Sequence, residues 1–263
     1  MSGAERALAA VLAHVPAFEP GHVWLAGAGP GDPGHLTAAV LVGLACAEVI
    51  VHDALVHGDV LDLADPRAER IFAGKRGGKP SADQADITAT LIARARTGAR
   101  VLRLKGGDPY IFGRGGEEAL ALTEAGVPFR VLPGITAGLA GLAAAGIPAT
   151  MRGLNKAVIL ATGHAAGTEE DLDWRALART GQPLVVYMGL KALPLIVAEL
   201  LAGGMAPDTP AAVVTSATTP DQRVLEAPLA AIAEEAERQA LAAPAIVVVG
   251  EIVTMRLRLG GRR

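Results

Sequence analysis

The stretch RVLRLKGGDPYIFGRGGEEALALTE, residues 100–124, decides the fold class of this chain. Its first part, 100–104, is a short apolar run that predicts a strand, and its last part, 116–124, predicts a helix. Between them the chain passes through several glycines, which let a ligand approach the backbone closely. Asp108 and Arg114 add a carboxylate and a guanidinium to this loop. A plain surface turn does not need all of these features, so we expect a ligand site at the end of this strand.

The same order of strand, loop and helix recurs on both sides of this stretch, which predicts an α/β protein. Expected strands lie at 23–26, 49–52, 129–132, 157–161, 184–187, 211–215 and 246–249. Expected helices lie at 36–47, 81–96, 137–145, 190–201 and 229–242. The segment 146–155, with proline, glycine and polar residues, marks a joint. We therefore expect a short helical extension at 1–21, an N-terminal α/β domain at 22–145 and a C-terminal α/β domain at 146–263.

The composition limits the classes of partner. The net charge of the 263 residues is −3 at pH 7. Nucleic-acid-binding domains usually carry a basic excess, so we expect no nucleic-acid partner. The longest apolar run, 37–51, contains Glu48 and falls short of the roughly 20 residues that span a membrane, so we expect no membrane segment. The only cysteine, Cys46, cannot form an internal disulfide, and we expect a buried thiol and a cytoplasmic location.

Two further glycine loops are similar to phosphate-binding motifs but depart from them. In GAGPGDP, residues 27–33, Asp32 stands where a dinucleotide fingerprint has its third glycine, and Pro30 removes a backbone donor. In GKRGGKPS, residues 74–81, a proline separates the last lysine from the serine, which a P-loop does not allow. The second loop nevertheless holds three cations that suit an acidic ligand, namely Lys75, Arg76 and Lys79.

Asp53 directly follows the expected strand 49–52. A carboxylate at a strand end often faces a cleft, but the local sequence equally allows Asp53 to be the N-cap of a helix. His52 and His164 have no partner at metal-ligand spacing. We therefore expect no metal site.

Taken together, these motifs resemble the tetrapyrrole methylase family. The similar stretches are GAGPGDP, the run 74–118, VPFRVLPGITAG at 127–138, TGH at 162–164 and VVYMG at 185–189. The likeness covers about residues 22–255, and its segments 74–81 and 105–118 are typical of the members that methylate uroporphyrinogen III. The resemblance implies two α/β domains with S-adenosylmethionine between them, and a homodimer. It also implies methylation of C2 and then C7 of uroporphyrinogen III, which gives precorrin-2.

The resemblance further implies roles for individual residues. Cofactor contacts are expected from Pro30, Gly106, Gly107, Asp108, Ile111, Thr136, Ala137, Met188, Ala217 and Ala245. Asp53 matches the family's proposed proton acceptor, and Lys75 matches its proposed proton donor. The tetrapyrrole carries many carboxylates, and the cations expected to bind them are Arg76, Lys79, Arg114 and Arg152.

The chain departs from the family at one motif, because it has Thr150, Met151 and Arg152 where the family usually has Thr-His-Arg. Three alternatives to a uroporphyrinogen III methylase are a methylase of a later precorrin, a nicotinamide dehydrogenase and a non-catalytic binding module. The loop 74–81 disfavours a methylase of a later precorrin. The missing third glycine disfavours a dehydrogenase. The matches at Asp53, Lys75 and Asp108 disfavour a non-catalytic module. The stretches 1–22 and 255–263 are short, so we expect no fused dehydrogenase or chelatase module.

Overall fold

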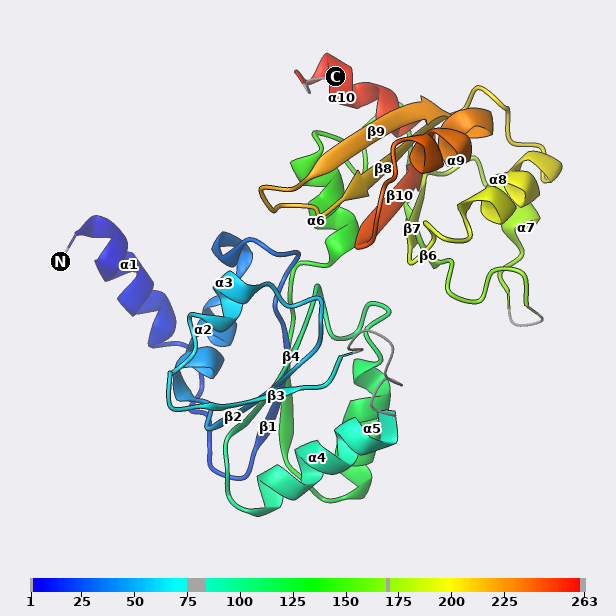
Figure 1. Ribbon diagram of the computed structural model, residues 1–263. Coiled ribbons are helices and arrows are strands. Elements are labelled where there is room, and N and C mark those ends of the chain that lie inside the picture. The colour runs from blue at the N-terminus through cyan, green and yellow to red at the C-terminus, as the bar shows by residue number, and fades with distance from the viewer. Residues whose placement is uncertain (1, 75–83, 169–170, 261–263) are drawn as a thin grey trace. The chain divides into compact units, whose positions relative to one another are not determined.

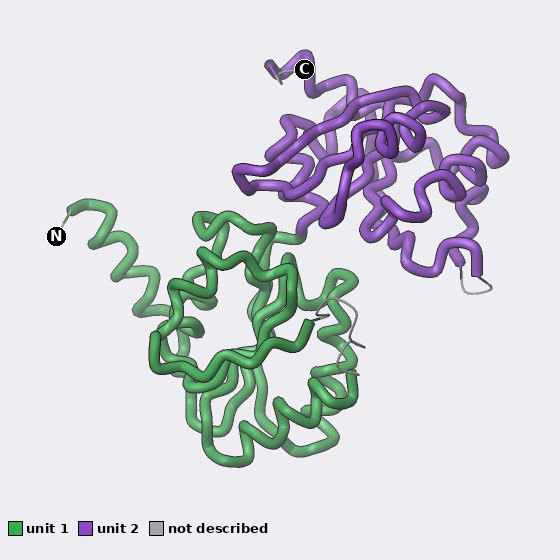
Figure 2. Tube along the Cα trace, viewed as in Figure 1, with its two compact units in different colours: residues 1–136 green, residues 137–263 purple. Residues whose placement is uncertain are grey.

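The computed structural model describes residues 2–74, 84–168 and 171–260. Contacts between Cα atoms divide the chain into two compact units, residues 1–136 and residues 137–263 (Figure 2). We describe each unit by itself. The sequence places the boundary after residue 145, whereas the structure places it ahead of helix α6 (Ala137–Ala144). The difference arises because α6 packs on strands of the second unit.

The first unit is built on a fully parallel sheet of five strands in the order β3-β2-β4-β1-β5. The strands are β1 (Val23–Gly27), β2 (Val49–His52), β3 (Glu69–Phe72), β4 (Val101–Lys105) and β5 (Phe129–Leu132). Because all five run the same way, every strand ends at one edge of the sheet. The sequence does not predict β3, since an edge strand with charged, exposed residues lacks a buried apolar run.

Helices cover both faces of this sheet (Figure 1). The helical segments of the unit are α1 (Gly3–Leu12), η1 (Pro33–His35), α2 (Ala38–Cys46), α3 (Gly58–Leu61), α4 (Gln84–Arg96) and α5 (Gly115–Glu124). One face, with Trp24 and Leu102, forms a buried apolar cluster with Leu44 of α2. The other face, with Val101, forms a second cluster with Leu122 of α5 and residues of α4. Burial on both faces is why the strands read as continuous apolar runs.

The N-terminal extension forms the predicted helix α1, which begins with a capping box between Ser2 and Glu5 and buries none of its residues. After it, Phe18 is buried and its ring stacks on Trp24 with ring centroids 4.1 Å apart. The end of the extension thus contributes to the core of the first unit. Cys46 at the end of α2 is exposed, so the expectation of a buried thiol is wrong.

The second unit is built on a mixed sheet of five strands in the order β6-β7-β10-β8-β9. The strands are β6 (Ile159–Thr162), β7 (Leu184–Tyr187), β8 (Pro210–Thr215), β9 (Arg223–Pro228) and β10 (Ala245–Val249). Only β6 and β7 pair in parallel, while β10 runs antiparallel to β7 and to β8, and β8 runs antiparallel to β9. The sequence does not predict the edge strand β9, because its burial is only partial.

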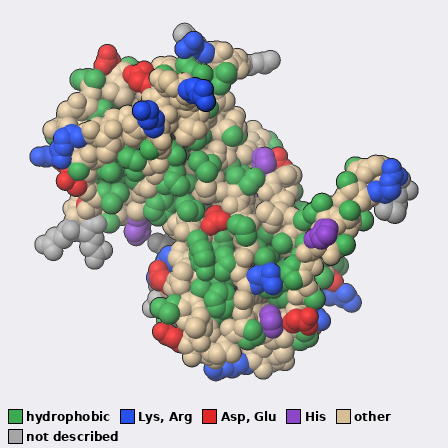
Figure 3. Space-filling view, turned by 180° about the vertical axis from the view of Figure 1, so that it is seen from behind, with side chains coloured by type: hydrophobic (Ala, Val, Ile, Leu, Met, Phe, Trp, Pro, Cys, Tyr) green, Lys and Arg blue, Asp and Glu red, His purple; other side chains and the backbone are tan. Residues whose placement is uncertain are grey.

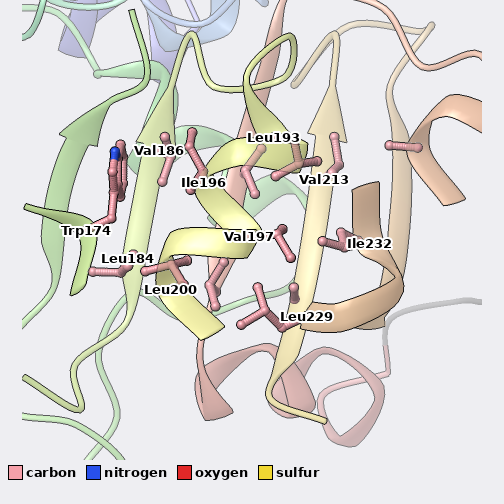
Figure 4. Packing of buried hydrophobic residues seen from close by; sticks show 14 of the residues in the cluster. Trp174, Leu184, Val186, Leu193, Ile196, Val197, Leu200, Val213, Leu229 and Ile232 are labelled. Atoms are coloured by element: carbon pink, nitrogen blue, oxygen red, sulfur yellow. The ribbon is translucent and has the colours of Figure 1, made fainter. Parts of the chain in front are cut away.

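Helices α7 (Trp174–Ala178), α8 (Leu193–Ala202) and α9 (Leu229–Arg238) cover one face of this sheet. Figure 4 shows their apolar side chains against those of the strands, with Ile196 and Val197 of α8 among them. The other face is covered in part by α6, and the unit ends with η2 (Glu251–Thr254) and α10 (Met255–Arg258). Both units are therefore α/β, as predicted. In the described part of the chain, no helix is long and apolar enough to cross a membrane.

Candidate active site

Four glycines bring the loops after β1, β4 and β5 into direct backbone contact. Gly107 and Gly29 exchange two hydrogen bonds, from Gly107 N to Gly29 O at 2.7 Å and from Gly29 N to Gly107 O at 3.1 Å. A Cβ atom on Gly134 would lie 2.2 Å from Gly107 O, and one on Gly27 would lie 2.5 Å from the same oxygen. Because such distances are sterically forbidden, only glycine lets the three strand ends converge.

The carboxylate of Asp108 holds two of these loops together. Its Oδ1 accepts a hydrogen bond from Tyr110 N at 2.8 Å, and its Oδ2 accepts one from Gly134 N at 3.0 Å. The first bond shapes the loop after β4, and the second ties this loop to the loop after β5. Asp108 is therefore a structural member of the strand-end edge, in addition to being a predicted cofactor contact.

All predicted cofactor residues of the first unit lie in the loops at this edge. Pro30 follows β1, the residues from Gly106 to Ile111 follow β4, and Thr136 follows β5. Gly106 is also constrained by packing, since a Cβ atom there would lie 2.6 Å from Leu55 Cβ in the loop after β2. In parallel α/β sheets, ligands bind beyond the carboxyl ends of the strands, which is where the structure gathers these residues.

The predicted cofactor residues of the second unit gather at one edge of its own sheet. Met188 follows β7 and is half exposed, and Ala217 follows β8. Ala245 starts β10, and because β10 is antiparallel to β8, it pairs with Thr215 at the same edge. Ala137 is the first residue of α6, and the Tyr187 hydroxyl accepts a hydrogen bond from the next backbone N–H, that of Gly138, at 3.0 Å. This bond seats the start of α6 beside the end of β7.

Unusual backbone conformations concentrate in these loops. Among the described residues, six that are not glycine have a φ between 46° and 69°. Five of them lie in the loops after β4, β7 and β8, namely Phe112, Arg114, Met188, Ser216 and Thr218. Such conformations cost about 1–3 kcal/mol each and cluster at functional sites. They therefore mark the same loops that the sequence motifs indicate.

Asp53 lies at the edge of the first sheet, directly after β2. Its Oδ1 accepts a hydrogen bond from Leu55 N at 3.0 Å, and the N-cap of the following helix α3 is His57. The alternative that Asp53 is a helix N-cap is therefore wrong. Its Oδ2 lies 3.9 Å from Nη2 of Arg103, and about a quarter of the side chain (24%) is exposed. Asp53 is thus oriented by the protein and partly open to solvent.

A buried cluster of charged side chains lies beside Asp53, and the sequence analysis does not predict it. Arg103 and Lys105 of β4 are 3% and 4% exposed, and both contact the carboxylate of Glu118, which is fully buried. Burial lowers the pKa of Lys105, and the neighbouring Arg103 lowers it further, while Glu118 opposes both effects. Charged residues at alternate positions of an otherwise apolar strand were the available signal.

The predicted substrate cations are only partly placed. Lys75, Arg76 and Lys79, including the predicted proton donor, lie outside the described residues. Arg114 is exposed and forms an ion pair with Glu117 at 2.6 Å at the start of α5. Arg152 is exposed and belongs to the second unit. Within the described ranges no cluster of three or more His, Cys, Asp or Glu side chains has the arrangement of a metal site.

Met151, which stands where a histidine is usual, is held in a compact loop. Its backbone N–H donates to Oδ1 of Asn155 at 2.9 Å, and Nδ2 of Asn155 donates to Ala149 O at 3.0 Å. The side chain of Met151 is 40% exposed. The asparagine thus shapes the loop without help from the side chain at 151.

Comparisons with known proteins point to one family. The family model of tetrapyrrole (corrin/porphyrin) methylases matches residues 22–233. A uroporphyrinogen-III C-methyltransferase of Sinorhizobium sp is 55% identical over 251 residues, which cover 95% of this chain and 90% of the relative. A siroheme synthase of Hahella chejuensis is 47% identical over 92% of this chain, but this chain spans only 51% of that protein.

Solved structures give the same result. The crystal structure of a uroporphyrin-III C-methyl transferase from Thermus thermophilus, complexed with S-adenyl homocysteine, matches with a TM-score of 0.77 and 40% identity. The match covers 89% of this chain and 99% of that one. Because the family model spans most of the sequence and a 55% identical relative is covered over 90% of its length, the chain belongs to the tetrapyrrole (corrin/porphyrin) methylase family.

Proposed function

We propose that this chain is an S-adenosylmethionine-dependent C-methyltransferase that methylates C2 and then C7 of uroporphyrinogen III to give precorrin-2. The observation that carries this proposal is the 55% identity to a uroporphyrinogen-III C-methyltransferase over 90% of that protein's length. The stretches 27–33 and 105–118 support it, because they meet at the carboxyl ends of the parallel strands, where α/β sheets commonly bind ligands.

The proposed cofactor residues have the chemistry that the methyl donor requires. S-adenosylmethionine has a polar amino-acid part, a ribose and a flat adenine ring, and when bound it supplies an electrophilic methyl group on a cationic sulfur. The glycine backbone at 106 and 107 offers polar groups without side-chain obstruction, and Met188 and Ile111 offer apolar surface. The full proposed set is Pro30, Gly106, Gly107, Asp108, Ile111, Thr136, Ala137, Met188, Ala217 and Ala245.

Asp53 is the proposed proton acceptor. When a pyrrole carbon of the porphyrinogen gains a methyl group, a ring proton must leave, and a carboxylate fixed at the sheet edge can accept it. Lys75 is the proposed proton donor. The cations Arg76, Lys79, Arg114 and Arg152 would hold the substrate through its carboxylates, which orients the reacting carbon.

The experiment that tests this function is anaerobic incubation of the purified chain with uroporphyrinogen III and S-adenosylmethionine, followed by mass analysis of the tetrapyrrole. We expect the masses of one and then two added methyl groups, and no change when the methyl donor is omitted. A parallel incubation with later precorrins separates the two methylase alternatives. Methylation of a later precorrin without methylation of uroporphyrinogen III would overturn the proposal.

A homodimer and a cytoplasmic location belong to the same proposal. The lone cysteine, which cannot form an internal disulfide, supports a reducing compartment. On the face seen in Figure 3, hydrophobic side chains gather on each unit, and exposed apolar patches commonly mark protein contacts. Sedimentation equilibrium gives the oligomeric state directly. A single species with the mass of one chain across micromolar concentrations would contradict the homodimer.

A further inference from the structure

One side of strand β4 carries charge into the interior of the first unit. Alternate residues of a strand share a face, so Val101, Arg103 and Lys105 all point toward α4 and α5. Val101 is part of the apolar cluster there, but Arg103 and Lys105 are cations that are almost completely buried. Buried cations are costly unless they are paired with anions and hydrogen-bonded. Both cations contact the carboxylate of one residue of α5.

That residue is Glu118, which has no exposed surface. Its Oε1 accepts three hydrogen bonds, from Arg103 Nε at 3.0 Å, from Lys105 Nζ at 3.1 Å and from Gln84 Nε2 at 3.0 Å. Its Oε2 is buried and has no hydrogen-bond partner in the described part of the chain. Glu118 therefore joins β4 to α5 and to the start of α4 through one carboxylate oxygen.

Arg103 connects this cluster to the proposed proton acceptor. While its Nε is held by Glu118, its Nη1 lies 3.4 Å from the carbonyl oxygen of Val51, the residue beside it in β2. Its Nη2 lies 3.9 Å from Oδ2 of Asp53, two residues beyond Val51. The guanidinium is planar and rigid, so fixing its Nε edge also fixes the edge that faces Asp53. The contacts thus form a chain from Glu118 through Arg103 to Asp53.

We propose that Glu118 is a positioning residue that acts through Arg103 on the carboxylate of Asp53. This inference rests on the proposed function, in which Asp53 accepts a ring proton. A buried charge cluster contributes little to the stability of the fold, since replacing it with apolar residues of similar volume often leaves the stability unchanged or raises it. It does place charge in one fixed geometry, and an error of about 1 Å in the position of a catalytic group can cost about 100-fold in rate.

The test is a double-mutant cycle on the full chain. Glu118→Gln removes the negative charge but keeps the shape of the side chain. Arg103→Lys keeps the positive charge but loses the edge of the guanidinium that faces Asp53. Each is made alone and together with Asp53→Asn. We expect each single variant to lower kcat about 10- to 100-fold, with the affinity for S-adenosylmethionine within about twofold of wild type. Combined with Asp53→Asn, neither should lower kcat further, because all three changes act through one group.

Glu69→Gln is the matched control, because it breaks an exposed ion pair of the same unit, between Glu69 and Arg94 at 2.6 Å. It should keep wild-type turnover. Thermal melting shows whether each variant is folded. If Glu118→Gln does not fold, Arg103→Lys still decides, since it leaves the number of charges in the cluster unchanged.

Three results would overturn the inference: wild-type turnover in a folded Glu118→Gln or Arg103→Lys variant, losses that multiply with that of Asp53→Asn, or a slow Glu118→Gln variant beside a fully active Asp53→Asn. Failure of the proposed function has a different signature, because the wild-type chain would then transfer no methyl group to uroporphyrinogen III.

Discussion

Oδ2 of Asp108 accepts a hydrogen bond from the backbone N–H of Gly134, 3.0 Å away, and so ties the loop after β4 to the loop after β5. The other oxygen of the same carboxylate accepts from Tyr110 N at 2.8 Å. One side chain therefore sets the shape of the loop that carries the most specific motif of the sequence. This relationship makes Asp108 the first residue to test.

Asp108→Ala should weaken the binding of S-adenosylmethionine without unfolding the protein. Hydrogen bonds to a charged group contribute about 1.5–3 kcal/mol, so the affinity should fall about 10- to 150-fold. Titration calorimetry measures the change, and the melting temperature shows that the variant is folded. Asp62→Ala is the control, since Asp62 is an exposed carboxylate of the same unit that contacts Arg70. Unchanged affinity in Asp108→Ala would refute this prediction.

Asp53→Asn should lower turnover and leave cofactor binding nearly intact. The amide has the shape of the carboxylate and can still accept the hydrogen bond from Leu55 N, but it cannot take up a proton. General base catalysis contributes about 10²–10⁴-fold, and the loss will be smaller where solvent also removes the proton. Single-turnover methylation of uroporphyrinogen III measures the effect. A wild-type rate in the Asn variant would show that Asp53 is not the proton acceptor.

Gly134→Ala should destabilise the first unit. The added Cβ atom would lie 2.2 Å from Gly107 O, so the loops after β4 and β5 would have to separate. Overpacking of this kind costs about 1–3 kcal/mol. Urea unfolding measures it against Gly116→Ala, where a Cβ atom meets nothing within 4 Å. Because alanine favours a helix over glycine by up to about 1 kcal/mol, the control should be neutral or slightly stabilising. Equal stability of the two variants would contradict the close approach of the strand ends.

Asp65 should contribute stability that depends on pH. Hydrogen bonds from the side chain and backbone of Arg67 lower the pKa of Asp65 from 3.8 to about 2. A lowered pKa in the folded state means that the stabilisation is complete above the unfolded value and is lost as pH falls toward the folded value. The difference in melting temperature between wild type and Asp65→Asn should therefore shrink steadily below about pH 5. A difference that stays constant down to pH 3 would rule out this linkage.

The agreement between sequence and structure is closest where a strand is a short, mainly apolar run between turn residues. The strands at 49–52, 129–132 and 184–187 have the predicted bounds, since a short apolar run between turn residues has few other uses. The edge strands β3 and β9 are not predicted, because exposed polar residues interrupt their apolar runs. The antiparallel course of β10 also had no local signal, because strand direction is decided by which neighbours pair.

The candidate site shows the same division. The motifs around Gly107, Asp108 and Asp53 are readable because glycines and charged residues directly after an apolar run are local features of the sequence. The contact between Glu118 and Arg103 is not readable, because the two residues lie 15 positions apart and their side chains meet only when α5 packs on the sheet. The exposure of Cys46 is not readable for a related reason, since its apolar neighbours do not reveal which side of α2 faces solvent.

The amino-acid order alone was sufficient for the α/β class and the family, because these depend on local patterns of apolar runs, glycines and charges. Only the folded chain reveals that Gly27, Gly107 and Gly134 meet, that Asp108 ties two loops together, and that Glu118 holds Arg103 beside Asp53. The physical reason is that these contacts join segments far apart in the chain. Their distances are set by the packing of whole strands and helices, which no local stretch of sequence encodes.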